Sequence, residues 1–157
     1  MIERLISELK KFDNSVVTFG EPATEQEIEE SETHLGQNLP NEYKEFVRKY
    51  NGLDFDCEYI LKVGNNICNT YSINKVYDFE HYNTENPMPL HLIPFAPDGF
   101  GNHYCFDMQK EGIIVFWQHD IDYTTTQPEI VYKSMADMIQ EVFIDWSELN
   151  YDGSPKR

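Results

Sequence analysis

The change of hydrophobic period near residue 53 constrains the fold more than any other feature of this sequence. Before this point apolar side chains recur at helical spacing, and in residues 40–52 they follow at i, i+3, i+4 and i+7. From residue 53 to about residue 132, short runs of β-branched and aromatic residues are separated by Gly, Asn, Asp and Pro, which indicates strands and turns. Residues 134–149 return to helical spacing, so we expect helices on both sides of a strand region.

Two more helices are predicted before the strand region. Residues 2–12 carry a single apolar stripe. Residues 24–36 begin with Thr24 and Glu27, three positions apart, which is the spacing of a capping box. Helices that flank a run of strands are typical of the α+β class, in which helices pack on one face of a mostly antiparallel sheet.

No repeat, linker or low-complexity tract divides the chain, so we expect a single domain over residues 1–157. Its core is predicted at about residues 20–149, followed by a frayed tail at residues 150–157. The apolar stripe of the last predicted helix consists of Met135, Met138, Ile139, Val142, Trp146 and Leu149.

The strand region contains five runs that predict four to six antiparallel strands. These runs lie at residues 57–63, 68–73, 90–96, 103–108 and 112–119. The last of them is apolar over most of its length, and we expect it to be central. The run at residues 103–108 alternates, with Tyr104, Phe106 and Met108 on one side and His103, Cys105 and Asp107 on the other.

The chain is strongly acidic, with 28 Asp and Glu against 12 Lys and Arg and a formal net charge of −16. Residues 1–50 hold 11 acids and 6 bases, whereas residues 51–157 hold 17 acids and 6 bases. Such a balance opposes binding to nucleic acid or to an anionic membrane, because both require basic side chains. It suits a basic protein partner, although acidity also serves solubility alone.

Two further features bear on the compartment. No apolar run approaches the roughly 18–20 residues that cross a bilayer, and the N-terminus lacks the uninterrupted apolar centre of a secretion signal. The three cysteines are odd in number and share no CxxC spacing. Reduced thiols in a cytoplasmic protein are therefore expected.

Residues 92–108 are the most crowded passage in potential functional groups. These groups are Asp98, Gly99, Gly101, Asn102, His103, Cys105 and Asp107. A phosphate loop requires glycines between a strand and a helix, but these glycines lie between two predicted strands. A zinc site could use His103 and Cys105, yet no second ligand pair has suitable spacing.

A cysteine nucleophile would require Cys105 beside a base, for which His91, His103 and His119 are the candidates. A tight turn between two strands needs fewer assumptions, because Asp-Gly and Gly-Asn are turn dipeptides. We therefore favour a structural turn here and predict no catalytic residue, no metal and no cofactor.

Two segments, LGQNLPNEYKEFVRKYNGL and LIPFAPDGFGNHYCFDM, resemble the SUKH superfamily, which is named after fungal cell-wall-synthesis regulators. The matching residues of the first segment are Leu35, Gly36, Leu39, Pro40, Tyr43, Phe46, Asn51 and Gly52. Those of the second segment are Pro94, Phe95, Gly101, Phe106 and Asp107. The resemblance spans about residues 20–146 and places these residues at core and turn positions.

The resemblance implies an α+β fold with a curved, mostly antiparallel sheet and no enzymatic activity. Bacterial members of the superfamily are largely immunity proteins that neutralise a cognate polymorphic toxin, often a nuclease, whereas fungal members are regulatory interaction proteins. The first role is the main functional prediction, and a regulatory or scaffold module is the alternative. The oligomeric state stays open.

A basic toxin would be bound by an acidic surface, and we place this surface in two groups of carboxylates that follow predicted elements. The hypothetical partner-binding residues are Asp54, Asp56, Glu58, Asp120 and Asp122. Each of them could equally be a solvated surface acid with no partner.

Overall fold

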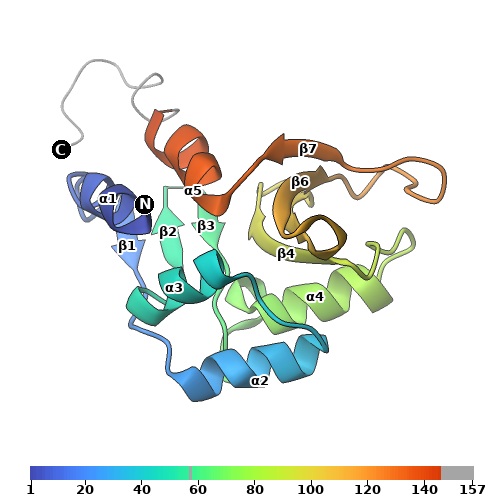
Figure 1. The fold of residues 1–157 in the computed structure, drawn as a ribbon, viewed down its shortest axis with the longest axis horizontal. Coiled ribbons are helices and arrows are strands. Elements are labelled where there is room, and N and C mark those ends of the chain that lie inside the picture. Colours follow the sequence, from blue (N-terminus) through green and yellow to red (C-terminus); the bar gives the residue numbers. More distant parts are fainter. Residues whose placement is uncertain (57, 146–157) are drawn as a thin grey trace.

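The computed structural model describes residues 1–56 and 58–145, and Figure 1 shows how its elements are arranged. The helices are α1 (Ile2–Leu9), α2 (Glu25–Leu35), α3 (Asn41–Lys49), α4 (Ile73–Tyr82) and α5 (Met135–Met138), with short 3-10 turns η1 (Asn69–Tyr71) and η2 (Met108–Lys110) and a π-helical segment η3 (Ile139–Asp145). The strands are β1 (Val17–Phe19), β2 (Leu53–Phe55), β3 (Glu58–Ile60), β4 (Leu92–Pro97), β5 (His103–Asp107), β6 (Ile113–Trp117) and β7 (Glu129–Tyr132).

The predicted α+β class is confirmed, with the antiparallel strands divided between two sheets. One sheet has the order β1-β2-β3 and the other the order β4-β5-β6-β7. A bulge between Pro94 and Ala96 leaves Phe95 without a partner on β5. The carbonyl of Phe95 instead accepts a hydrogen bond from the Leu61 amide at 2.8 Å, so the two sheets are joined by backbone pairing.

The three helices predicted before residue 53 are confirmed as α1, α2 and α3, and α2 has its predicted capping signal. The Thr24 hydroxyl accepts from the Glu27 amide at 3.2 Å, and the Glu27 carboxylate accepts from the Thr24 amide at 2.8 Å, which completes the capping box. Gly36 ends α2 in the left-handed conformation, with φ of 67°. Pro40 then occupies the N-cap position of α3.

Helix α4 corrects the prediction of strands throughout residues 53–132. The predicted strand at residues 68–73 is wrong, since this segment forms η1 and the first residue of α4. The buried face of α4 includes Asn74, Glu80 and His81, while Phe79 is 56% exposed. Polar side chains on the inner face and an aromatic one outside removed the apolar stripe by which a helix is recognised.

The C-terminal helix begins as predicted, but its hydrogen bonding changes after one turn. Its N-terminus is capped by the Ser134 hydroxyl, which accepts from the Asp137 amide at 3.1 Å. The Glu42 carboxylate of α3 accepts two more amides, from Met135 at 2.9 Å and from Ala136 at 3.0 Å. Trp146, Leu149 and the predicted tail at residues 150–157 lie outside the described residues.

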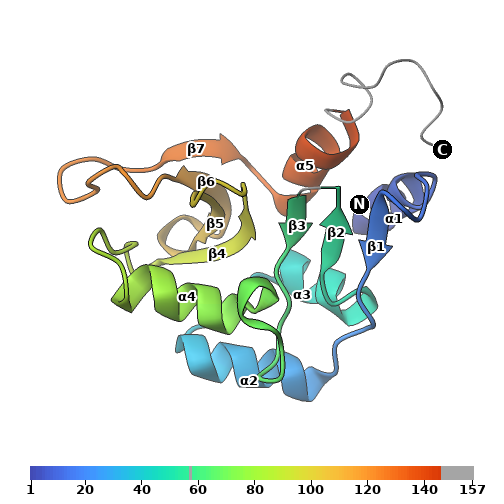
Figure 2. The same ribbon diagram turned by 180° about the vertical axis from the view of Figure 1, so that it is seen from behind.

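Figures 1 and 2 show the two sheets side by side, with α2, α3 and α4 along one side and with α1 and α5 near the three-stranded sheet. The main core takes residues from both sheets and from α1, including Leu5 and Leu9. A smaller cluster covers the opposite face of the four-stranded sheet and contains Cys105 and Trp117. The predicted alternation of β5 is confirmed, because Phe106 lies in the main core and Cys105 in the smaller cluster.

Candidate functional site

The crowded passage forms the turn between β4 and β5, and Asp98 occupies its hydrogen-bond donors. One carboxylate oxygen of Asp98 accepts from the Phe100 amide at 2.7 Å and from the Asn102 amide at 3.1 Å. The Asn102 side chain donates to the other oxygen at 2.7 Å. These donors, which a phosphate would need, are already bonded to a carboxylate, so the turn interpretation stands.

Cys105 is surrounded by groups that keep its thiol protonated. Its side chain is fully buried, and its Sγ atom lies 3.9 Å from the Met88 sulfur and 3.6 Å from the His103 carbonyl. Burial, and then the charge of Glu80, raise the pKa of this thiol well above its usual value. A nucleophile requires the opposite shift toward thiolate.

The three histidines considered as bases point to other partners. His103 Nε2 lies 2.9 Å from the Glu80 carboxylate, and both side chains are buried. His91 Nε2 faces the Asp107 carboxylate at 3.8 Å, and His119 Nδ1 lies 3.0 Å from the side-chain oxygen Oδ1 of Asn102. Across residues 1–56 and 58–145, no group of three or more His, Cys, Asp or Glu side chains is arranged to hold a metal ion.

The first family segment holds α3 against the sheets. The hydroxyl of Tyr43 donates to the Leu61 carbonyl at 2.6 Å, and burial raises the pKa of Tyr43. The side chain of Asn51 binds both backbone groups of Val63, donating to its carbonyl at 3.0 Å and accepting from its amide at 2.9 Å. A Cβ atom at Gly52, where φ is +95°, would lie 2.6 Å from Lys62.

The second family segment is equally structural. The rings of Phe95 and Phe106 stack with centroids 4.0 Å apart, and Pro94 is buried in β4 opposite Cys105. Asp107 is 1% exposed, and its carboxylate accepts from the Gln109 amide at 3.0 Å. The same carboxylate forms an ion pair with Lys110 Nζ at 3.2 Å. The remaining motif residues Leu35, Leu39 and Phe46 lie in the main core, and Gly101 lies beside the His119 ring.

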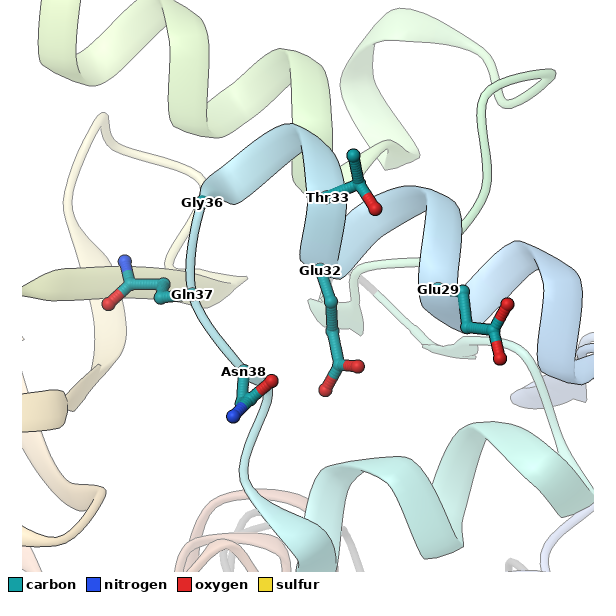
Figure 3. A pocket seen from close by; sticks show the side chains of 6 residues that line it. All are labelled: Glu29, Glu32, Thr33, Gly36, Gln37 and Asn38. Atoms are coloured by element: carbon teal, nitrogen blue, oxygen red, sulfur yellow. The ribbon is translucent and has the colours of Figure 1, made fainter.

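A hollow lies at the end of α2, where the chain turns toward α3 (Figure 3). It is formed by Glu29, Glu32, Thr33, Gly36, Gln37 and Asn38. In Figure 3 the Glu32 side chain extends from α2 toward α3. Its carboxylate accepts from Lys44 at 2.9 Å and from the Leu39 amide at 2.8 Å, so it stabilises the connection between α2 and α3.

The five acids predicted to bind a partner lie at separate places. Asp54 pairs across the β2–β3 hairpin with Tyr59 and lies against Tyr71, whose pKa is raised first by the Asp54 charge. Asp56 is exposed in the hairpin turn with φ of 56°. Glu58 lies on β3 and faces the other side of the hairpin from Asp54.

The remaining two predicted acids lie in the loop between β6 and β7. Asp120 and Asp122 are both exposed, and Asp122 accepts from the Thr124 amide at 2.8 Å. This hydrogen bond lowers the pKa of Asp122. Figures 1 and 2 show the loop at the outer end of the four-stranded sheet, away from the hairpin near α1 and α5. The five acids therefore do not form one continuous patch.

Glu58 belongs to a different group that the sequence did not reveal. We name this group the Glu58 hollow, a depression of about 280 Å³ lined by Glu58, Tyr104, Tyr132, Glu141 and Val142. Its residues come from β3, β5, β7 and η3. The rings of Tyr104 and Tyr132 are 6.1 Å apart and form its aromatic wall.

The environment of the Glu58 hollow disfavours the charged form of Glu58. Burial, and then the charge of Asp98, raise the pKa of Glu58 above its usual value. Burial, followed by neighbouring groups that include Glu58, raises the pKa of Tyr104 to about 12. Among residues 1–56 and 58–145, no Lys or Arg forms an ion pair with Glu58, Asp98 or Glu141.

No pattern in the sequence joins the members of the hollow. Tyr104 appeared only as one side of an alternating strand, Asp98 as a turn residue, and Val142 as part of a helical stripe. Glu141 and Tyr132 belong to the C-terminal region, far along the chain from Glu58. Only the packing of η3 beside the hairpin, where Phe143 meets Phe55 edge to face at 5.8 Å, brings them together.

Comparison with known proteins agrees with the motif and with the fold. Residues 25–138 match the model of the SUKH_6 family, which is described as SMI1-KNR4 cell-wall. The chain belongs to the SUKH family. Members of this family are known as immunity proteins, and SUKH domains are generally non-enzymatic immunity or regulatory domains.

Two similar proteins of Bacillus subtilis (strain 168) are themselves uncharacterised. The SPbeta prophage-derived protein YokK is 22% identical over 164 residues, covering 87% of this SUKH chain and 83% of YokK. The protein YnaB is 38% identical over 99 residues, covering 62% of this chain and 59% of YnaB.

A solved structure shows the same fold. A crystal structure of a protein from Pseudomonas syringae pv. tomato covers 91% of this SUKH chain with a TM-score of 0.69 at 20% identity, and 98% of that chain is matched. Within the described part of the chain, the helices are too short or too polar to cross a membrane.

Proposed function

We propose that this SUKH protein is a bacterial immunity protein that binds and neutralises a cognate polymorphic toxin. The partner is a basic protein, such as a nuclease, and the contact is made by acidic surface in the strand half of the chain. Neutralisation requires only tight binding, so this function assigns no catalytic residue and no cofactor to the protein.

One observation carries the proposal beyond family membership. The acidic side chains around the Glu58 hollow lack basic partners within the described chain, although carboxylates elsewhere have them. A nuclease carries a basic cleft for phosphates, and a negative inhibitor surface would occupy that field. Complementary charge also raises the association rate, which matters for an inhibitor that must act before the toxin does.

Co-expression with the product of the adjacent open reading frame tests the function directly. We expect growth that is lost with the neighbouring protein alone to be restored by this protein, and the two to co-purify as a one-to-one complex. Absence of both rescue and co-purification would contradict toxin neutralisation. If loss of the gene instead disturbed the cell wall, the regulatory module would become the better assignment.

The predicted acids are best tested as two sets, because the structure separates them. One variant reverses the charges of Asp54, Asp56 and Glu58, and the other reverses Asp120 and Asp122. Charge reversal of the set that lies at the interface should weaken toxin binding. It should also make binding depend less on salt concentration, because fewer ion pairs remain to be screened. A set whose reversal changes neither quantity lies outside the interface.

A further inference from the structure

We propose that the Glu58 hollow is a socket for one Lys or Arg side chain of the partner protein. The inference rests on the proposed function for the identity of the partner, but the socket is defined by residues of this chain alone. The docking surface would then lie at the junction of β3, β5, β7 and η3.

The size of the hollow favours a single side chain. Its volume of about 280 Å³ falls at the lower end of the range for small-molecule pockets, roughly 300–1,000 Å³. Its wall offers Val142, which is half-buried, to the methylene stem of a long basic residue. The two tyrosine rings offer faces over which a cation is attracted by the ring quadrupole.

The charges of the hollow select a cation. Glu58 and Glu141 both line it, and Asp98 adds negative charge close to Glu58. Burial raises the pKa values of Tyr104 and Tyr132, so both phenols stay neutral and can donate or accept a hydrogen bond. A bound ammonium or guanidinium would compensate the charge of Asp98, which disfavours the ionised form of Glu58 in the free protein.

In two other hollows of the described residues, a lining carboxylate already has a basic partner. In the hollow at the end of α2, Glu32 already binds Lys44 at 2.9 Å. In the hollow lined by α4 and β5, Glu80 already lies 2.9 Å from His103. Glu32 and Glu80 are thus paired with basic side chains of the chain, whereas Glu58 has no basic partner among the described residues.

The experiment uses a probe that carries one cation, so that it reports the socket rather than a whole interface. The probe is an acetylated, amidated Gly-Gly-Arg-Gly-Gly peptide, and its control replaces Arg with citrulline, which has nearly the same shape and no charge. Titrations followed by NMR should shift the signals of Tyr104, Tyr132 and Val142 with the arginine peptide and not with the citrulline peptide.

Two pairs of variants make the test specific. Glu58→Gln with Glu141→Gln should weaken binding of the arginine peptide about tenfold, since each exposed charge pair contributes modestly. Glu29→Gln with Glu45→Gln removes the same formal charge from exposed positions on α2 and α3 and should change binding less than about twofold. Tyr132→Phe should retain most of the binding and Tyr132→Leu should lose it, because only the former keeps an aromatic face.

The possible outcomes distinguish failure of the socket proposal from failure of the proposed immunity function. Equal losses in the two double Gln variants, or equal binding of the citrulline peptide, would overturn the socket, because net charge or shape would then account for the contact. Unchanged binding in Glu58→Gln with Glu141→Gln would overturn it as well. If this same variant still rescued cells from the toxin, the immunity function would stand and the socket would not be needed for it. If the wild type bound the arginine peptide but gave no rescue, the socket would stand and the immunity function would fail.

Discussion

The helical N-terminal third and the strand region use their acidic side chains differently. Residues 1–50 place acids against bases, as in Glu8 with Lys11 at 2.6 Å, Glu25 with Arg48 at 2.6 Å and Glu32 with Lys44 at 2.9 Å. They also use Glu27 and Glu42 to cap helices. Around the Glu58 hollow, Glu58, Asp98 and Glu141 have no such basic partner among the described residues.

The difference separates two roles of negative charge. Acids with basic partners stabilise the arrangement of the helices, whereas a half-buried acid without a basic partner, such as Glu58, costs stability and is available to another molecule. Four substitutions test this division, and they are ordered here by the size of the expected change in the free energy of unfolding.

The largest effect is expected inside the helical scaffold, at Asn51. Asn51→Ala leaves the amide and the carbonyl of Val63 buried without partners, which should lower the free energy of unfolding by about 3 kcal/mol. Urea unfolding measures this change. Asn38→Ala, at an exposed position, is the control and should be nearly neutral. A similar loss in both variants would show that Asn51 does not hold the strand region to α3.

Glu42 tests whether an acid of the helical part stabilises through a helix cap. Glu42→Ala removes the two hydrogen bonds to the amides of Met135 and Ala136 and should cost about 1–2 kcal/mol. The exposed Glu45 of the same helix supplies the control variant Glu45→Ala. If the two variants unfold at the same urea concentration, the cap contributes nothing measurable.

Glu58 should behave in the opposite way, because its charge is unfavourable in the free protein. Its pKa is raised in the folded state, so its favourable contribution is present below the ordinary value of 4.5 and is lost as the pH rises through the raised value. Glu58→Gln should therefore stabilise the free protein at pH 7 by about 0.5 kcal/mol, a small figure because the side chain is half-buried. The gain should shrink at pH 4, where wild-type Glu58 is largely protonated.

The control for Glu58 is again a carboxylate on α3. Glu45→Gln removes a charge at an exposed position and should leave the free energy of unfolding at pH 7 nearly unchanged. Destabilisation by Glu58→Gln at pH 7 would mean that Glu58 has a stabilising partner, and the contrast between the two regions would fail at its central residue.

The smallest effect is expected for the exposed pair of Glu25 and Arg48. Glu25→Gln removes the negative charge and one of the two oxygens that accept from the guanidinium at 2.6 Å and 2.9 Å, yet exposed ion pairs contribute little because water and salt screen them. The thermal midpoint should stay within the error of measurement, at low and at high salt alike. A clear loss at low salt that disappears at high salt would show that surface pairs contribute more to the helical part than we propose.

Part of the fold followed from local sequence alone. Thr24 and Glu27 close a capping box within four residues, and Tyr43 and Phe46 lie on one face of α3 because their spacing matches the helical period. Asp98 and Gly99 lie in a turn for an equally local reason. Helix α4 could not be found in this way, because Glu80 and His81 face inward. Glu80 contacts His103 of β5, and His81 contacts the Tyr77 carbonyl of its own helix and the Pro89 carbonyl beyond the helix.

The sequence by itself determined the α+β class, the two helices of the family segment, the turn after β4 and the excess of acid in the strand region. Only the tertiary structure decided which acids are paired and which face one another. The reason is physical: an N-cap or a turn depends on hydrogen bonds between residues a few positions apart. The environment of Glu58 depends instead on burial and on the charge of Asp98, and both arise only when the two sheets and η3 have packed.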